Sequence, residues 1–376
     1  MFSVLAHPLR IALALFSAFA VSYFMVPSVK RFAESVGAID MPNARRINKV
    51  PIPRMGGIAI FCGFIFSALL FVELTDQVKG ILIGSGIIAV MGGFDDVYNL
   101  SPRIKLTVQI GAAIVCVACG VVVDGITNFM ADEEMFYLSQ PISILVTVVW
   151  IVGCTNAINL IDGLDGLAVG MSAISATTLF IISIIVEDIN INVSVILVCV
   201  IGACVGFLPY NRNPARIFMG DVGSQMLGFL LSTISVMGIF KMHALVTMLI
   251  PFLAMAVPLA DTAFAFIRRI LKGQSPFHAD KGHFHHRLLA MGLSQSQAVT
   301  VMYAISIMLG IFAYLMIGKT RNVKIVCLVV AFVLVLFIVV YVLKIYPRTH
   351  PKPRVDDDMV EEDIKIYHEK GRNTNE

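Results

Sequence analysis

Long apolar stretches alternate with short polar segments along most of the chain. About eleven of these stretches approach the roughly 20 residues that an α-helix needs to cross a bilayer. They run from Leu9 to Val26, Gly57 to Leu74, Gly80 to Phe94, Ile104 to Val123, Pro141 to Leu160, Leu167 to Val186, Ile191 to Leu208, Val222 to Phe240, Ala244 to Ile267, Ala298 to Ile317 and Val323 to Ile345. The third is short and rich in glycine, so we expect it to be tilted less than its neighbours or to lie where the bilayer is thin. The pattern predicts an all-α integral membrane protein, a polytopic bundle of about eleven transmembrane helices.

The composition supports this prediction. The 376 residues are 58% hydrophobic and 14% charged, with a mean hydropathy of +0.86, whereas soluble domains contain about 25% charged residues. All seven cysteines lie inside apolar stretches, where cysteine acts as a small packing residue rather than as a disulfide partner or a metal ligand. No signal-peptide cleavage site is evident, so we expect the first apolar stretch to be retained as a span.

Lysine and arginine gather in alternate loops. The basic loops carry Lys30, Arg31, Arg45, Arg46, Lys49, Arg54, Arg103, Lys105, Arg212, Arg216, Arg268, Arg269, Lys272, Lys281 and Arg287. The opposite loops hold only Lys79, Lys241, Lys319, Arg321 and Lys324. The positive-inside rule makes the basic side cytoplasmic, and an odd number of spans then places the N-terminus outside and the C-terminus inside. We expect residues 1–346 to form one transmembrane domain and the charged residues 347–376 to form a flexible cytoplasmic tail.

A strongly polar segment, residues 156–166, ends the fifth apolar stretch with the sequence Asn-Ala-Ile-Asn-Leu-Ile-Asp-Gly-Leu-Asp-Gly. Ionisable groups beside a bilayer core are costly, and most of them line a site or pair with a partner. The two glycines allow the backbone to leave a helix and to approach a ligand closely. The segment therefore fits two alternatives, a ligand site at a helix end and a polar helix terminus capped by Asn and Asp.

Further polar clusters fall on the same basic side of the chain. They are Asp95-Asp96 after the third stretch, residues 211–221 before the eighth, and His283, His285 and His286 after the ninth. Each has a simpler interpretation, such as a water-facing helix end, an N-cap formed by Asp221 or Ser224, or a solvated basic loop. Asp261 is a single acid within the ninth stretch, and its simpler interpretation is pairing with Arg268.

Taken together, the clusters indicate a metal and phosphate site on the cytoplasmic face. Carboxylate and amide oxygens suit Mg²⁺, with Mn²⁺ as an alternative ion. Arg and Lys complement phosphate oxygens, and a metal with cationic side chains is the recurring equipment of phosphoryl transfer. Phe218, beside Gly220 and Asp221, is placed to stack on a nucleobase. The histidines lack the HExxH spacing of a zinc protease, so we favour anion contact or proton relay for them.

Four motifs, in this order, resemble the polyprenyl-phosphate N-acetylhexosamine-1-phosphate transferase family. They are Gly93-Phe94-Asp95-Asp96, residues 156–168, Phe218-Met219-Gly220-Asp221-Val222-Gly223-Ser224 and His283-Phe284-His285-His286-Arg287-Leu288-Leu289. The resemblance extends from about Asp40 to Val299. It implies that the transmembrane domain is catalytic and moves a sugar-1-phosphate from a UDP-sugar to undecaprenyl phosphate, with Mg²⁺ and release of UMP. It also implies active-site loops on the cytoplasmic face of a bacterial inner membrane.

The resemblance implies roles for individual residues. Asp95, Asp96, His285 and His286 match catalytic positions, and one of the two aspartates is often proposed as the base toward the lipid phosphate. Asp221 matches the magnesium ligand, with Asp95 and Asp96 as further candidates. The positions implied in substrate binding are Lys49, Lys105, Asn156, Asn159, Asp162, Asp165, Asn211, Phe218 and His283.

Two branches of this family differ in their sugar donor. The branch that uses UDP-MurNAc-pentapeptide usually has three consecutive histidines and a Thr in an Asn-Leu-Thr-Asp-Gly run. This chain has His-Phe-His-His-Arg and Ile161 instead, and Arg54 stands where that branch tends to have Thr. The chain is therefore more similar to the branch that uses UDP-GlcNAc and starts teichoic acid linkage units, O-antigen or enterobacterial common antigen.

This resemblance predicts UDP-GlcNAc, undecaprenyl phosphate and the lipid bilayer as partners, and no nucleic acid. The oligomeric state stays open, with a homodimer as one candidate. The alternatives are the peptide-donor transferase, a membrane metallohydrolase and, from another class, an ion-coupled transporter that uses intramembrane acids. Transporter sites usually lie near the bilayer midplane, whereas most carboxylates of this chain fall at one surface.

Overall fold

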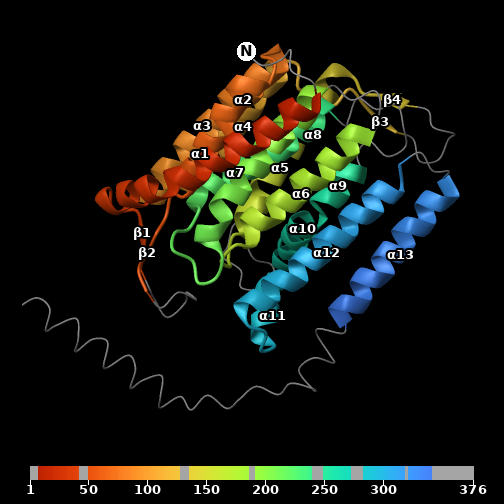
Figure 1. Ribbon diagram of the computed structural model, residues 1–376. Coiled ribbons are helices and arrows are strands. Elements are labelled where there is room, and N and C mark those ends of the chain that lie inside the picture. The colour runs from red at the N-terminus through yellow and green to blue at the C-terminus, as the bar shows by residue number, and fades with distance from the viewer. Residues whose placement is uncertain are drawn as a thin grey trace, which may run out of the picture.

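The computed structural model describes residues 7–41, 50–127, 135–185, 191–238, 249–271, 283–317 and 321–340. The helices are α1 (His7–Ser35), α2 (Gly57–Phe71), α3 (Asp76–Tyr98), α4 (Pro102–Ala118), α5 (Gln140–Ile161), α6 (Leu167–Ile185), α7 (Ile191–Asn211), α8 (Gly220–Gly238), α9 (Leu249–Ala254), α10 (Ala256–Leu271), α11 (Phe284–Ala290), α12 (Gln295–Leu315) and α13 (Arg321–Val340). Two short antiparallel hairpins pair β1 (Ile39–Asp40) with β2 (Ile52–Pro53), and β3 (Gly125–Thr127) with β4 (Met135–Tyr137). The predicted all-α class is confirmed, since the long helices form one bundle (Figure 1).

Every predicted apolar stretch overlaps a helix among the described residues. Within the described part of the chain, six helices are long and apolar enough to cross a membrane, namely α1, α3, α5, α6, α7 and α12. The expectation of a short third helix is wrong, because α3 has 23 residues and is one of these six. The predicted ninth span is divided into α9 and α10. The chain is therefore a multi-pass membrane protein.

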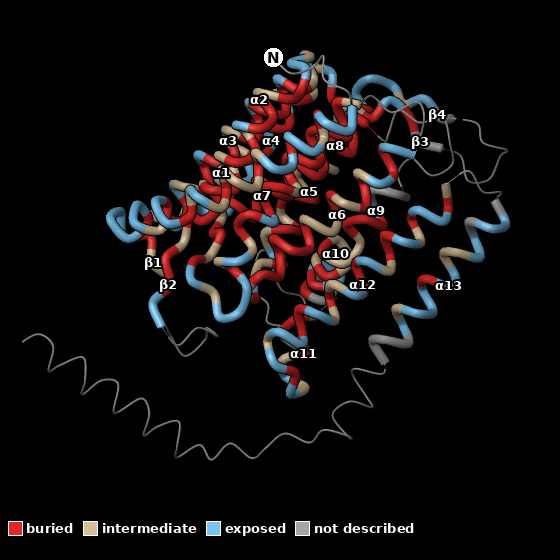
Figure 2. The backbone as a smooth tube through the Cα atoms, viewed as in Figure 1, coloured by how far each residue is buried: buried red, intermediate tan, exposed pale blue. Residues whose placement is uncertain are grey.

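Helix α8 lies at the centre of the bundle and packs against α2, α3, α5, α6 and α7. Each of its residues is buried except Asp221, in the first turn, which is partly exposed. Figure 2 shows the buried residues concentrated in this central part, with exposed residues along the outer helices. A central helix that exposes only its first acid directs that acid toward one end of the bundle.

The outward faces of the bundle are apolar. Phe16 and Phe24 on α1, Val90 on α3, Leu145 on α5 and Phe332 on α13 are each more than half exposed. Exposed apolar surface is unfavourable in water. In a bilayer it carries no such cost, because lipid tails are as apolar as these side chains.

Close approach of backbones locks the first turns of α2 and α8 together. A side chain on Gly57 would overlap the backbone nitrogen of Gly223, so glycine is required for this contact. Just before these helices, the two chain segments pair like strands: the Gly56 nitrogen donates to the Phe218 carbonyl at 2.9 Å, and the Phe218 nitrogen donates to the Pro53 carbonyl at 2.9 Å. The β1–β2 hairpin is thereby held beside the start of α8.

Arg10, Asn192 and Glu73 form a polar network, which we call the Arg10 network. It lies where α1 and α7 begin and α2 ends, at the end of the bundle away from Asp221. The buried Arg10 donates from Nε to the Phe71 carbonyl at 2.6 Å and from Nη2 to Asn192 Oδ1 at 2.7 Å. Asn192 Nδ2 in turn donates to Glu73 Oε2 at 3.3 Å. The network joins three helices where they begin or end.

Two of the sequence predictions lie outside the described residues. These are the charged tail, residues 347–376, and the substrate position Lys49.

Candidate active site

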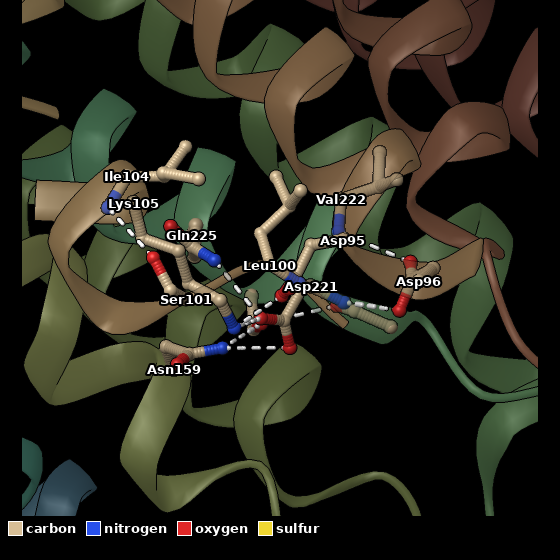
Figure 3. A network of polar contacts seen from close by, with 12 residues as sticks. Asp95, Asp96, Leu100, Ser101, Ile104, Lys105, Asn159, Asp221, Val222 and Gln225 are labelled. Carbon is tan, nitrogen blue, oxygen red and sulfur yellow. Dashed lines mark hydrogen bonds and ion pairs between the residues drawn. The ribbon is translucent and has the colours of Figure 1, made fainter. Parts of the chain in front are cut away.

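Two carboxylates from different helices meet at one lysine. Lys105, near the start of α4, is ion-paired with Asp95 at the end of α3 and with Asp221 Oδ2 at 2.8 Å (Figure 3). The Leu100 nitrogen also donates to Asp95 Oδ1 at 2.7 Å. Two adjacent carboxylates repel each other, and a shared ammonium group offsets that repulsion. We call Asp95, Lys105 and Asp221 the Asp221 cluster.

Asp96 has a different environment from its neighbour. Its carboxylate accepts hydrogen bonds from the backbone nitrogens of Asp221 at 3.0 Å and Val222 at 3.4 Å. It therefore caps the N-terminus of α8, where the unpaired N–H groups and the helix dipole favour an anion. Arg54 Nε approaches Asp96 Oδ1 at 3.7 Å and Asp40 Oδ1 at 3.8 Å.

The turn that carries Asp221 depends on a glycine. Gly220 has a φ of +68°, a region that residues with a side chain rarely adopt. A Cβ atom at Gly220 would also overlap Asp96 Oδ2. The Gly-Asp sequence thus allows Asp96 to cap α8 and Asp221 to project from the same turn.

The Asp221 carboxylate also accepts hydrogen bonds from two amide side chains. Asn159 Nδ2 donates to Asp221 Oδ1 at 3.1 Å and to Ser224 Oγ at 2.8 Å, and Gln225 Nε2 donates to Asp221 Oδ2 at 3.0 Å. Asn156, three residues before Asn159, instead faces Gln109, to which its Nδ2 donates at 2.7 Å.

A cavity of about 560 Å³ opens beside Asp221. Its lining residues are Asp40, Val50, Ile52, Arg54, Asn159, Asp162, Gly163, Leu164, Asp165, Asn211, Asn213, Pro214, Ala215, Phe218, Gly220, Asp221, His286 and Gln295. Four of these are aspartates, and Arg54 is the single Lys or Arg in this described lining. A volume of several hundred Å³ with a few convergent polar groups is typical of a small-molecule site.

Three segments join to form part of the cavity wall. Asp165 Oδ2 accepts hydrogen bonds from Asn213 Nδ2 at 2.9 Å and the Ala215 nitrogen at 3.0 Å, and Asn213 Nδ2 also donates to Gln295 Oε1 at 2.8 Å. Asn211 Oδ1 accepts from the Gly166 nitrogen at 3.1 Å. The end of α7, the loop after α5 and the start of α12 are thereby joined around the cavity.

Asp162 follows the last residue of α5 and is half-buried. Burial, together with the charges of Asp221 and Asp96, raises the pKa of Asp162 to about 8. Its carboxyl group is therefore mostly protonated at neutral pH, which reduces the negative charge of the cavity.

The three histidines occupy different positions. His283 Nδ1 lies 2.8 Å from Asp261 Oδ2, and the Phe284 nitrogen donates to Asp261 Oδ1 at 2.8 Å, so Asp261 anchors the start of α11. The expected pairing of Asp261 with Arg268 involves a side chain that lies outside the described part. His286 lines the cavity.

His285 is buried against Gly163, where a Cβ atom would overlap its Nε2. Both of its ring nitrogens are without a hydrogen-bond partner among the described residues. Burial, and then the nearby His286, lower the pKa of His285 to about 4, so the imidazole is neutral at pH 7.

The predicted site residues that the structure describes thus fall into three groups, while Lys49 lies outside the described residues. Asn159, Asp162, Asp165, Asn211, Phe218, Asp221 and His286 line the cavity. Lys105 contacts Asp221 directly, and Asp95 is joined to Asp221 through the shared Lys105. Asp96, Asn156, His283 and His285 are absent from the described lining, and each contacts other protein groups.

Sequence reasoning missed several residues of this site. Arg54 was used only to separate branches, and Asp40, Asn213 and Gln295 were not singled out at all. Gln109 and Gln225 carried a usable signal, because each is an amide within an apolar stretch, where polar side chains are costly.

The residues present fit a divalent cation held partly by substrate. Among the described residues, no group of three His, Cys, Asp or Glu side chains is arranged to hold a metal ion by itself. Mg²⁺ does not require such a cage, since it is usually bound by one or two carboxylates together with waters and substrate phosphates. Asp221 is the carboxylate of the Asp221 cluster that lines the cavity.

The fold and the site define a multi-pass helical membrane protein with an acidic cavity at one end of the bundle. A family model, glycosyl transferase family 4, matches residues 78–239. A Bacillus subtilis protein, named as a probable undecaprenyl-phosphate N-acetylglucosaminyl 1-phosphate transferase, is 40% identical over 88% of this chain and 90% of its own length. The Mycobacterium tuberculosis decaprenyl-phosphate N-acetylglucosaminephosphotransferase is 35% identical over 79% of this chain and 80% of its own.

A more distant relative, the phospho-N-acetylmuramoyl-pentapeptide-transferase of Staphylococcus aureus, is 30% identical over 80% of this chain and 95% of its own. The chain belongs to the polyprenyl-phosphate N-acetylhexosamine-1-phosphate transferase family, as its four motifs predicted.

Proposed function

We propose that this protein transfers GlcNAc-1-phosphate from UDP-GlcNAc to undecaprenyl phosphate, giving undecaprenyl-diphospho-GlcNAc and UMP. The observation that carries the proposal is an acidic cavity lined by residues of three family motifs, with Asp95 of the remaining motif joined to Asp221 through Lys105, in a chain 40% identical to the Bacillus subtilis relative. The product would be the first lipid-linked intermediate of a cell-envelope polysaccharide. The peptide-donor reaction is the alternative, and its named relative is less similar at 30% identity.

The proposed reaction is a single displacement at phosphorus. An oxygen of the lipid phosphate attacks the phosphorus next to GlcNAc, the bond from that phosphorus to the bridging oxygen breaks, and UMP leaves with the bridging oxygen. A phosphate monoester has a second pKa near 6, so the attacking group is already largely dianionic at neutral pH. Stabilisation of charge should therefore contribute more than base catalysis by Asp95 or Asp96.

The cavity has an excess of carboxylates, which would repel a diphosphate unless cations offset them. Arg54 and Lys105 are the basic side chains placed to do so, one in the lining and one against Asp221. Bound Mg²⁺, or Mn²⁺ in its place, would supply further neutralisation of the diphosphate, with Asp221 as its protein ligand. Phe218 and the amide of Asn159 line the cavity and are available to the nucleoside. The Asn211 amide accepts from the Gly166 nitrogen and donates to the Ile217 carbonyl, so it supports the wall.

The membrane setting follows from the acceptor. A long polyprenyl chain stays in the bilayer, so its phosphate must meet the soluble nucleotide sugar at a membrane surface. We infer that the cavity faces the cytoplasm, that the N-terminus lies outside and the C-terminus inside, and that about eleven helices span the bilayer. The support is the distribution of Lys and Arg, which favours the side that carries the motifs.

The test is incubation of the purified protein with labelled UDP-GlcNAc, undecaprenyl phosphate and Mg²⁺. We expect equal amounts of UMP and of a lipid diphosphate that carries the label. A parallel reaction with UDP-MurNAc-pentapeptide should give no product. UMP release with the peptide donor alone would favour the alternative branch, and absence of UMP with both donors would refute the proposed activity.

A further inference from the structure

Three amide side chains, of which two are buried and Asn156 is partly buried, form a chain that ends on Asp221. Gln225 Nε2 donates to Asp221 Oδ2 at 3.0 Å, Gln109 Nε2 donates to Gln225 Oε1 at 2.8 Å, and Asn156 Nδ2 donates to Gln109 Oε1 at 2.7 Å. Gln225 is fully buried and Gln109 is 2% exposed. We call Asn156, Gln109 and Gln225 the amide chain. It connects α5, α4 and α8, and Gln225 is seen beside Asp221 in Figure 3.

The carboxylate determines the direction in which Gln225 and Gln109 donate their hydrogen bonds. An ionised carboxylate can only accept, so Gln225 must turn its NH₂ group toward Asp221 and its carbonyl toward Gln109. Gln109 must then donate to Gln225 and accept from Asn156. The NH₂ group of Asn156 also donates to the Val152 carbonyl at 2.8 Å, one turn earlier on α5. Gln225 and Gln109 therefore both point their NH₂ groups toward Asp221, and aligned hydrogen bonds strengthen one another. Gln109 Nε2 also reaches Asn156 Oδ1 at 3.5 Å, so the contact between Asn156 and Gln109 runs in both directions.

The amide chain decides which part of Asp221 remains available to a ligand. Oδ2 accepts from both Gln225 and Lys105, which uses its two lone-pair directions. Oδ1 accepts from Asn159, which leaves one direction on that oxygen. With Gln225 held by Gln109 and Asn156, the carboxylate cannot rotate without breaking a buried hydrogen bond, which is costly where water is absent.

We propose that Gln225, Gln109 and Asn156 are positioning residues that orient the Asp221 carboxylate for metal and diphosphate. The proposal rests on the proposed function and deepens it. It also changes the role of Asn156, which acts through Gln109 rather than by touching the nucleotide sugar, in accordance with its absence from the described cavity lining. None of the three residues is a catalytic residue in this proposal.

The test uses Gln109→Met, which keeps the size of the side chain and removes its hydrogen bonds. Gln109 does not contact Asp221 itself, because Gln225 lies between them. Outer partners of metal ligands typically contribute about 10- to 100-fold in metal affinity or activity. We expect Gln109→Met to lower kcat about tenfold and to raise the half-saturating Mg²⁺ concentration, with the KM for UDP-GlcNAc changed less than about twofold. A residue needed only for packing would tolerate this volume-conserving change.

Asn156→Leu and the double variant provide a second measurement. Breaking the amide chain at Gln109 already disconnects Asn156, so the double variant should be no more impaired than Gln109→Met alone. If the losses in kcat of the two single variants multiplied in the double variant, the residues would act independently and the proposal would be overturned. A raised KM for UDP-GlcNAc in Asn156→Leu, with kcat unchanged, would instead restore direct substrate contact for Asn156.

The control is Thr147→Val, also on α5. Thr147 is fully buried, accepts from the Val123 nitrogen at 2.9 Å and donates to the Ser143 carbonyl at 2.7 Å, far from Asp221 along the helix. This variant should lower the thermal unfolding midpoint without changing kcat or the Mg²⁺ requirement. Loss of kcat in this control equal to the loss in Gln109→Met would show a general effect of buried polar groups and would overturn the proposal.

Binding of Mn²⁺ to the purified protein without substrate, followed by electron paramagnetic resonance, separates the two levels of inference. We expect Gln109→Met to bind Mn²⁺ about tenfold more weakly than the wild type. If that loss appeared while even the wild type released no UMP, the proposed function would fail and the amide chain would stand. If the wild type released UMP and Gln109→Met retained full kcat and Mn²⁺ affinity, the amide chain would be refuted.

Discussion

Both ends of the bundle contain a buried polar group, yet the two groups differ in charge balance. In the Arg10 network, one buried cation donates to a carbonyl and to an amide oxygen, and its one carboxylate, Glu73, is exposed to solvent. Around the Asp221 cluster, carboxylates outnumber the cations, and Asp221 opens onto a cavity of about 560 Å³. None of the members of the Arg10 network lines that cavity.

This difference distinguishes two roles of polar residues within apolar helices. A polar group whose hydrogen bonds are met inside the protein stabilises the packing of the helices that it joins. A group of carboxylates with too few cations, beside a space that water can enter, is stable only with a bound cation or with protons. The first arrangement indicates architecture, and the second indicates a site.

The largest predicted effect is on activity at the cavity end. Asp221→Asn removes the charge that faces the cavity, and we expect kcat for UMP release to fall about 10²- to 10³-fold, as when an essential electrostatic group is lost. The matched control is Asp76→Asn, which removes an exposed carboxylate from a surface ion pair with Lys79 and should leave kcat unchanged. Asp221→Asn activity within tenfold of the wild type at ordinary Mg²⁺ concentrations would contradict the metal assignment.

The second prediction concerns the opposite end, where stability rather than activity should respond. Arg10→Met removes two hydrogen bonds from a charged donor, and we expect a loss of about 2 kcal/mol in the free energy of unfolding. The kcat/KM of the folded fraction should stay at the wild-type value. Unfolding monitored in detergent, alongside UMP release, provides both measurements. A selective loss of kcat/KM with unchanged stability would mean that the Arg10 network belongs to the site.

Much of the fold could be predicted because the signals are local. The length of an apolar stretch and the position of basic loops depend on neighbouring residues alone, and they placed the helices and grouped the acids at one end. The length of α3 was missed because Asp76 and Lys79 at its start, and Asp95 and Asp96 at its end, resemble loop residues. In the structure, Asp76 pairs with Lys79, Asp95 pairs with Lys105, and Asp96 accepts hydrogen bonds from the first turn of α8.

The contacts that define the site could not be predicted, because they join segments far apart in the chain. Asp261 contacts His283, which lies 22 residues on and outside its own helix, and no local signal pointed to this contact. Asn156 and Asn159 look equivalent in the sequence, but the helix turns one toward Gln109 and the other toward Asp221. Residue type and spacing identify the chemistry, whereas the direction of each side chain depends on the packing of several helices.

The third prediction tests how closely α11, which carries His285 and His286, must fit against the cavity. A Cβ atom in Gly163→Ala would overlap His285 Nε2, so the buried His285 ring must shift, and we expect the shift to disturb the neighbouring, cavity-lining His286. Overpacking of this kind costs about 1–3 kcal/mol, and we expect a loss of about tenfold in kcat/KM. Gly153→Ala, ten residues earlier on α5, meets nothing within 4 Å and should behave as the wild type. Equal activity of the two variants would show that the contact with His285 is not needed.

The smallest predicted effect is a pH dependence at Asp162. Because its pKa is raised to about 8, the carboxyl group is protonated at pH 7 and becomes ionised as the pH rises through 8. Ionisation adds a negative charge to a cavity that already contains Asp165 and Asp221, so binding of an anionic donor should weaken. We expect the KM for UDP-GlcNAc to rise about threefold between pH 7 and pH 9 in the wild type. Asp162→Asn, which stays neutral, should keep a constant KM over this range, and an equal rise in that variant would assign the titration to another group.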